Sequence, residues 1–449
     1  MKTDTTEIFA NAPVPKAVLS NVIPSIISML MVLVYNLADT FFIGQTKNAY
    51  MVAGVSIATP AFLLFMAVGM LFGIGGTSFI ARMLGEGQTQ KAKQTSSFCF
   101  WTGTIIGVIS AILVICFAKP ICSLIGASSD TMGYASQYLS IVGIGIPFLI
   151  IGNAFSNIIR AEGQAQIAMF GMIIGNVINI VLDPVLILGL HWNVAGAAIA
   201  TVFGNVFSAG FYIYHLWKKS QLLSISPKDY LAGNGIATSV LMIGVPASLN
   251  SVLMSFSNIL VNNLMKEYND MAVAGLGVAI KVNMIVVMLL IGLGTGIQPL
   301  LGYCYGARNR KRFLAVLKFS TILAIGISLV MTTICYSGAE FLVRAFLDND
   351  EAFSYGFQFS RIYIYSGPIM GVLFVYINAI QAMGAALPAL ILNISRQGLI
   401  YIPVLFSFHA IFNTPEILAL AQPMTDYGSA TLAVILFLIA FHKHFKPTK

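Results

Sequence analysis

Three aspartates lie inside long apolar runs of the sequence, where a carboxylate is costly and therefore informative. They are Asp39, Asp183 and Asp426. An ionisable group at the middle of a bilayer costs roughly 2.5–3.5 kcal/mol on insertion scales, so such groups are expected at functional sites. Carboxylate oxygens are hard ligands that suit a cation such as Na⁺, and two close carboxylates can instead share one proton. The chemistry indicated is reversible binding of a small cation.

The first apolar run carries polar side chains on the helix face that holds Asp39. Asn36 and Tyr35 precede this aspartate by three and four residues, the spacing that places side chains on one face of a helix. The sequence places all three towards the outer end of the run.

The fifth and sixth apolar runs carry a second polar face. Asn176, Asn179 and Asp183 follow one another at spacings of three and four residues, and Pro184 comes next. A proline lacks the N–H that a helix needs, so we expect the helix to bend or loosen beside the carboxylate. The sixth run adds Thr201, Asn205 and Ser208.

A structural alternative applies to all of these residues, because polar groups also join membrane helices through hydrogen bonds. This alternative is strongest for Asp426, whose apolar run has an indistinct start. Two cations, Lys281 and Arg396, are embedded or nearly embedded. We expect each to reach the membrane surface or to pair with an acid rather than to bind substrate.

The composition indicates a membrane protein. The chain has 449 residues, of which 58% are hydrophobic and 9% charged, against about 25% charged in soluble domains. Its mean hydropathy is +0.87. The net charge of +8 does not indicate a nucleic-acid partner, because the basic residues lie in short loops between apolar runs.

Twelve apolar segments are long enough to span a membrane, which takes about 20 residues. We expect helices, since strands of a membrane barrel would show short alternating runs. The predicted limits are 17–43, 52–80, 95–118, 133–159, 166–190, 194–217, 236–264, 271–303, 313–336, 357–381, 388–412 and 417–441. The first is too long for a cleaved signal peptide.

The basic residues predict the orientation. Sixteen of the 24 Lys and Arg lie at the termini and in even-numbered loops, whereas the odd-numbered loops hold four. Those four are Lys47, Lys119, Lys266 and Arg344. Positive charge accumulates on the cytoplasmic side, so we expect both termini there.

The chain repeats itself with an offset of 221 residues, or 222 in places. Matching landmarks are Gly54 with Gly275, Gly73 with Gly294, Pro147 with Pro368, Asn157 with Asn378, Gly163 with Gly384, and, at 222, Pro24 with Pro246. Six spans per half make the repeat parallel, about an axis along the membrane normal. The predicted units are a first lobe 1–217, a cytoplasmic linker 218–235 and a second lobe 236–449.

The repeat does not extend to the embedded acids. Val261 stands at the position that matches Asp39, and Asp426 matches Asn205. The predicted cation chemistry therefore belongs to the first half.

The sequence gives no indication of an enzyme. It shows no Ser/His, Cys/His or paired-His constellation in the apolar runs and no GxxxxGK[ST] phosphate loop. The five cysteines lack metal-ligand spacing. We expect no cofactor beyond a coupling ion.

Several motifs resemble those of the multidrug and toxic compound extrusion (MATE) family. They are the run from Asp39 to Gly44 with Pro24 upstream, the run from Asn157 to Gly163 with its echo from Asn378 to Gly384, and the run from Asn179 to Pro184. The resemblance covers essentially the whole chain. It is closest to the DinF-like branch, near MepA-like bacterial pumps.

The resemblance implies an all-α membrane fold of twelve helices in two lobes around a V-shaped cavity. It implies a bacterial inner-membrane antiporter, expected to be a monomer, that exports amphipathic cationic drugs in exchange for H⁺ or Na⁺. By motif position, the resemblance assigns the cation site, with Na⁺ as one occupant, to Asp39, Asn179, Asp183 and Thr201. Cavity or coupling neighbours would be Tyr35, Asn36, Tyr138, Asn153, Asn157, Asn176, Asn205 and Asp426, and the hinges would be Pro24 and Pro184.

The NorM-like branch uses acids in the seventh and tenth helices, where this chain has Asn258, Asn262 and Asn378. That departure argues against a cation site in the second lobe. The alternative function is a flippase for lipid-linked saccharides, from the same superfamily. A flippase cavity would need more cations to hold a pyrophosphate than Lys281 and Arg396 provide.

Overall fold

The protein is described by a computed structural model over residues 7–46, 48–347 and 349–444. All regular secondary structure in these ranges is helical. In the first half the helices are α1 (Glu7–Ala10), α2 (Val14–Gly44), α3 (Ala49–Gly85), α4 (Thr89–Ile125), α5 (Ser129–Ala161), α6 (Ala165–Asp183), the π-helix η1 (Pro184–Gly189) and α7 (Asn193–Lys218).

The linker contains the 3₁₀ turn η2 (Pro227–Asp229). The second half comprises α8 (Ile236–Lys266), α9 (Asp270–Gly306), α10 (Arg310–Ser337), α11 (Ala339–Arg344), α12 (Asp350–Ile364), α13 (Gly367–Ala382), α14 (Ala386–Ile394), the π-helix η3 (Ser395–Leu399), α15 (Tyr401–Phe412) and α16 (Pro415–His444).

The predicted spans agree with the helices. Within the described ranges, eleven spans are long and apolar enough to cross a membrane, and the pair α12–α13, bent by 50°, makes a twelfth if counted as one. The prediction 357–381 covers this bent pair, with Pro368 at the start of its second helix. Most spans extend a few residues beyond their predicted limits, because polar turns at helix ends carry no hydropathy signal.

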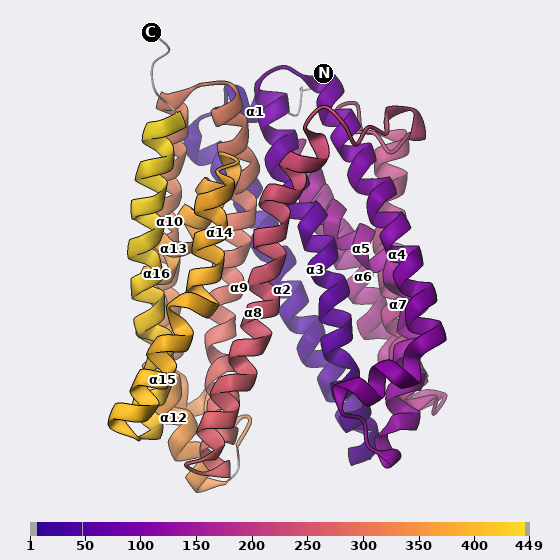
Figure 1. Ribbon diagram of the computed structural model, residues 1–449, viewed down its shortest axis with the longest axis vertical. Coiled ribbons are helices and arrows are strands. Elements are labelled where there is room, and N and C mark those ends of the chain that lie inside the picture. Colours follow the sequence, from indigo (N-terminus) through magenta and orange to yellow (C-terminus); the bar gives the residue numbers. More distant parts are fainter. Residues whose placement is uncertain (1–6, 47, 348, 445–449) are drawn as a thin grey trace.

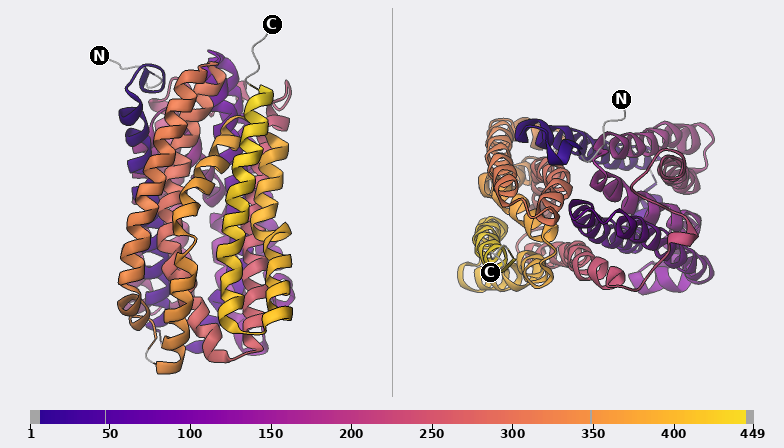
Figure 2. Two further views of the ribbon diagram at one scale, coloured as in Figure 1. Left: turned by 90° about the vertical axis from the view of Figure 1, so that its left-hand side faces the viewer. Right: turned by 90° about the horizontal axis from the view of Figure 1, so that it is seen from above.

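The helices form two bundles that follow the two halves of the sequence (Figure 1). Helix α1 and the end of α16 lie at one end of the molecule, which we call the termini end (Figures 1 and 2). The ribbons of the two bundles diverge towards the opposite end (Figure 1).

Glycines allow the two halves to pack closely near the termini end. A Cβ on Gly75 of α3 would collide with the Val240 backbone of α8, and one on Gly296 of α9 would collide with Asn21 and Val22 of α2. Gly75 and Gly296 occupy matching positions of the repeat. The two halves are therefore sealed against each other by two equivalent glycine contacts, which we call the glycine seal. Small residues of this type let membrane helices approach backbone to backbone.

The first helix of each half begins inside the other half. Phe9, Ala17 and Val18 belong to the apolar core of the second half. Ile236 and Val240, at the start of α8, belong to the core of the first half. The two bundles are thus joined by an exchange of helix ends.

Contacts within each half confirm the repeat. Asn157 of α5 packs on Gly73 of α3, and its counterpart Asn378 of α13 packs on Gly294 of α9. Both asparagines donate Nδ2 to a carbonyl four residues earlier on their own helix, at 3.0 and 2.8 Å. The matched residues therefore make matched contacts.

Candidate cation-binding site

The predicted cation-binding residues come together between α2, α5, α6 and α7, all from the first half. Asp183 closes α6, Asn179 stands one turn before it, and Thr201 faces them from α7. All three side chains are buried, with Asp183 at 0% exposure. Asp39 reaches this group from α2, which packs along α6.

Two glycines make the crossing of α6 and α7 tight enough for these side chains to meet. A Cβ on Gly175 would lie 2.8 Å from the Gly204 oxygen, and one on Gly204 would lie 2.7 Å from the Gly175 oxygen. The backbones therefore touch one turn before Asn179. This contact places the amide of Asn179 beside the hydroxyl of Thr201.

The Asn179 amide connects Asp183 with Thr201. When its nitrogen faces Asp183, it donates to Oδ2 at 2.9 Å, and its oxygen accepts from Thr201 N at 3.0 Å and Oγ1 at 3.3 Å. This orientation satisfies both ends of the amide, which is how amide orientations are assigned. The carboxylate of Asp183 is thereby fixed through one oxygen.

The other oxygen of Asp183 and one oxygen of Asp39 are uncommitted. Oδ1 of each is buried and has no hydrogen-bond partner among the described residues. The two carboxylates are close enough to interact electrostatically. Tyr35 of α2 and Tyr138 of α5 lie within electrostatic range of both. Buried polar atoms are almost always satisfied, so these two oxygens are available to a proton or a bound cation.

The donor set fits a proton or a monovalent cation. Two carboxylates and a hydroxyl are hard oxygen ligands, with tyrosine hydroxyls nearby. No group of three or more His, Cys, Asp or Glu that could hold a metal ion occurs among the described residues. The site therefore lacks the ligand set of a structural transition-metal centre.

The remaining predicted neighbours divide into two groups. Asn176 and Asn205 are half-buried on α6 and α7, and Nδ2 of Asn176 has no partner within the described part of the chain. Asn36 is exposed on α2. By contrast, Asn153 and Asn157 donate to backbone oxygens of α5 and pack on the glycines of α3. The last two therefore contribute to helix packing.

Asp426 lies in the other half of the molecule. Its Oδ1 is 3.2 Å from Nε of Arg396, and both side chains are buried. Arg396 thus pairs with an acid, one of the two outcomes expected for it. Lys281 lies on α9 with its ammonium 5.2 Å from the ring centre of Phe346, and its side chain is exposed.

The two predicted hinge prolines have different local structures. At Pro184 the α-helix changes into a π-helical turn, directly after Asp183. At Pro24 the helix α2 continues without a break from Val14 to Gly44. A role for Pro24 as a hinge stays a prediction.

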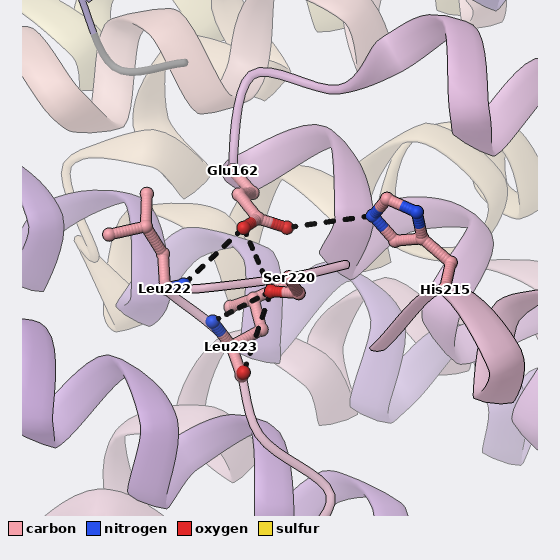
Figure 3. Close-up of polar contacts among 5 residues, drawn as sticks. All are labelled: Glu162, His215, Ser220, Leu222 and Leu223. Atoms are coloured by element: carbon pink, nitrogen blue, oxygen red, sulfur yellow. Dashed lines mark hydrogen bonds and ion pairs between the residues drawn. The ribbon is translucent and has the colours of Figure 1, made fainter. Parts of the chain in front are cut away.

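The predicted runs 133–159 and 166–190 leave Arg160 and Glu162 in the loop between them. Glu162 does lie in the turn after α5, but Arg160 belongs to the last turn of α5, and both are buried, each 1% exposed. Glu162 accepts from Ser220 Oγ at 2.8 Å and from the Leu222 backbone at 3.4 Å, with His215 Nε2 4.0 Å away (Figure 3). This glutamate fastens the linker to the first half.

Burial raises the pKa of Glu162 above the usual range, and its hydrogen bonds from Ser220 and Leu222 partly oppose that change. The signal in the sequence was the polar Arg160 and Glu162 directly before Gly163, whose φ of 81° forms the turn.

The predicted run 52–80 leaves Arg82 in the following loop, whereas the residue lies in the last turn of α3. Its guanidinium lies against Gly384, which belongs to the other half and has a φ of 70°. One turn earlier, Ser78 Oγ donates to the Gln381 oxygen at 2.5 Å. These contacts close the termini end between α3 and the end of α13.

Two related helix bundles, sealed at one end and carrying an ionisable site in one bundle, define a two-lobe membrane transporter. The family model MatE matches residues 24–185 and again 246–407, which repeats the offset of 222. The chain belongs to this family, the MATE transporters, and is a transporter rather than an enzyme.

Relatives and solved structures agree with that assignment. The multidrug export protein MepA of Staphylococcus aureus (strain MSSA476) is 31% identical over 413 residues, covering 92% of this chain and 91% of the relative. MepA of Staphylococcus haemolyticus (strain JCSC1435) is 30% identical over the same shares. The resemblance to MepA-like proteins is confirmed.

The fold is that of MATE structures. A MATE protein in complex with MaL6 superposes with a TM-score of 0.92 at 23% identity, covering 99% of each chain. A multidrug resistance MATE transporter of the MOP superfamily in its outward-facing conformation gives 0.91 at 23% identity, covering 99% of this chain and 98% of that one.

Proposed function

We propose that this protein is a secondary active multidrug exporter, which exchanges amphipathic organic cations for H⁺ or Na⁺ across a bacterial inner membrane. One observation carries the proposal: two embedded carboxylates of one lobe, Asp39 and Asp183, are close enough to interact electrostatically, and each has an oxygen without a hydrogen-bond partner among the described residues. The MepA relatives, which are multidrug export proteins, supply the substrate class.

In this mechanism the cationic drug and the coupling cation compete for the negative charge of the two carboxylates. While Asp39 and Asp183 are ionised, a cationic drug in the lobe is favoured. A proton or Na⁺ that binds from outside neutralises them and disfavours the drug. Only a difference in binding between the two conformations can drive the exchange, and the α2 helix, which carries Asp39, is the element that would respond.

The orientation is part of the proposal. We expect both termini on the cytoplasmic side, because of the basic residues there. The glycine seal at the termini end would then be the cytoplasmic gate, and the conformation described here would face outward. We expect the working unit to be a monomer.

Ethidium efflux from energised, pump-deficient bacteria tests the proposal. Asp183→Asn should abolish efflux, whereas Asp130→Asn, an exposed carboxylate at the start of α5, should leave it unchanged. If Asp183→Asn exports ethidium at the normal rate, the carboxylate pair does not couple transport.

Proteoliposomes with an imposed pH or Na⁺ gradient then identify the coupling ion. The flippase alternative predicts no drug transport under either gradient. It would be supported instead by transbilayer movement of a pyrophosphate-linked lipid.

A further inference from the structure

The second half contains a polar cluster about one helical turn from the positions that correspond to the proposed cation site. A π-helical turn, η3, adds one residue to the second half, so the repeat offset changes from 221 before it to 222 after it, and the π-helical turn η1 of the first half then returns it to 221. Buried positions then correspond in pairs: Gly175 with Arg396, Asn179 with Tyr401, and Asp183 with Leu405. On the facing helix, Thr201 corresponds to Gln422 and Asn205 to Asp426.

One oxygen of Asp426 needs no ligand, because side chains of the same half already bind it. Asp426 is 0% exposed, and its Oδ1 lies 3.2 Å from both Arg396 Nε and Gln422 Nε2. The guanidinium also lies over the Phe374 ring, 5.1 Å from its centre. The second oxygen, Oδ2, has no partner among the residues that the structure describes.

The surroundings of the two clusters are alike. Tyr363 and Tyr401 lie within electrostatic range of Asp426, as Tyr35 and Tyr138 do around the aspartates of the first half. Each half therefore surrounds a buried carboxylate with two tyrosines. The two clusters differ in the source of positive charge, because in the second half the side chain of Arg396 provides it.

We propose that the Arg396 guanidinium is a tethered cation that permanently occupies a cation position beside Asp426, about one turn from the second half's counterpart of the cation site. Asp426 is then a latent site for Na⁺ or a proton, held out of exchange by its covalently attached partner. This inference rests on the proposed function for the first-half site. It makes Arg396 the residue that restricts cation exchange to one lobe.

The physical reason is the cost of an unpaired buried charge. A carboxylate removed from water must be neutralised by a partner, a bound ion or a proton. In the wild type, Arg396 does this and no soluble cation can compete at Asp426. When Arg396 is replaced by a neutral side chain, Asp426 must take a cation from solution or a proton.

The experiment measures binding of ²²Na⁺ and proton uptake by purified protein in detergent. The background Asp39→Asn/Asp183→Asn removes the first-half site. Adding Arg396→Gln should create one new site per chain for Na⁺ or a proton, and adding Asp426→Asn as well should remove it again. Arg396→Lys, which keeps a tethered cation, is the matched control and should create none.

If Arg396→Gln folds poorly, its thermal stability provides a second measurement of the same proposal. Its melting temperature should then rise with Na⁺ or with falling pH, while Arg396→Gln/Asp426→Asn should fold independently of both. The proposal is overturned if Arg396→Gln gains no site and no such dependence, or if removing Asp426 leaves the new binding in place.

The outcome is separable from that of the proposed function. Drug transport by Asp39→Asn/Asp183→Asn alone would refute the first-half site. The latent site is instead measured as the difference between Arg396→Gln and Arg396→Gln/Asp426→Asn in that same background.

Discussion

Where α6 crosses α7, Gly175 touches the Gly204 backbone, and the aspartate two turns further on keeps an uncommitted oxygen. At the matching crossing of the second half, Arg396 stands in the place of that glycine and neutralises Asp426 on the facing helix. In the first half the crossing helices touch backbone to backbone, and the nearby carboxylate can still bind a cation. The crossing in the second half is closed by a side chain that carries the cation itself.

The difference shows how a duplicated scaffold can be specialised without changing its fold. The packing asparagines, the turn glycines and the seal between the halves are retained in both lobes. A glycine in one lobe and an arginine in the other decide whether the buried acid can exchange its partner. Three predictions test this comparison, from the largest expected effect to the smallest, and a fourth with a smaller effect tests the contact of Glu162 with the linker.

Asp426→Asn should destabilise the protein far more than Asp183→Asn. The first change leaves the buried Arg396 without its acid, and breaking a buried pair costs about 3–5 kcal/mol. The second removes a charge that has no fixed cation partner, so we expect little loss of stability. Thermal unfolding in detergent measures both.

The double variant Arg396→Met/Asp426→Leu is the control, because replacing both partners with apolar side chains is often neutral or stabilising. Equal melting temperatures for Asp426→Asn and Asp183→Asn would contradict the contrast between the two lobes.

Asn179→Ala should weaken coupling while the protein still folds. The amide holds the Asp183 carboxylate at 2.9 Å, and hydrogen bonds to charged groups contribute about 1.5–3 kcal/mol. We expect the cation concentration for half-maximal drug exchange in proteoliposomes to change at least tenfold. Tyr401→Phe, at the matching position of the second half, should leave it unchanged, and a similar change for both would remove the distinction.

Gly175→Ala should impair transport by separating α6 from α7. The new Cβ would lie 2.8 Å from the Gly204 oxygen and 2.9 Å from Ser208 Cβ, and overpacking of this kind costs about 1–3 kcal/mol. The shift should part Asn179 from Thr201 and slow ethidium efflux several-fold. Gly210→Ala on α7, where a Cβ meets nothing within 4 Å, should transport normally. Normal efflux by Gly175→Ala would show that the close crossing is unnecessary.

Glu162→Gln should change the pH dependence of stability by a small amount. Burial raises the pKa of Glu162 in the folded protein, so the folded state binds this proton more tightly than the unfolded state. Its contribution is present at low pH and lost as pH rises above the usual glutamate range, about 4.3. The wild type should therefore lose stability there relative to Glu162→Gln, measured by melting temperature against pH. The opposite slope would mean that the bonds to the linker outweigh the burial.

Much of the fold was predictable because lipid imposes simple requirements on a sequence. Continuous apolar runs predicted the spans, and the nearly constant offset of 221 or 222 residues predicted the two related bundles. The bend between α12 and α13 was not predicted, since the matching Pro147 lies inside an unbroken α5. A proline permits a bend, and its neighbours decide whether the bend occurs.

The candidate site was predictable where a single embedded charge marks it. Asp39 and Asp183 stand out in hydropathy, and helical spacing adds Asn179. The pairing of Arg396 with Asp426 spans 30 residues and depends on the π-helical turn, which no local pattern reveals. The burial of Arg160 and Glu162 was not predicted, because polar residues at helix ends look the same whether they are exposed or buried.

The exchange of helix ends between the bundles has a consequence for ancestry. Phe9 and Val18 complete the core of the second half, and Ile236 and Val240 complete that of the first. A six-helix precursor with this arrangement would have lacked part of its own core. It would have folded as an isologous parallel homodimer, each subunit lending its leading segment to the other. Once two such subunits are joined in one chain, matching positions can differ, as Gly175 and Arg396 do, which two identical subunits do not permit.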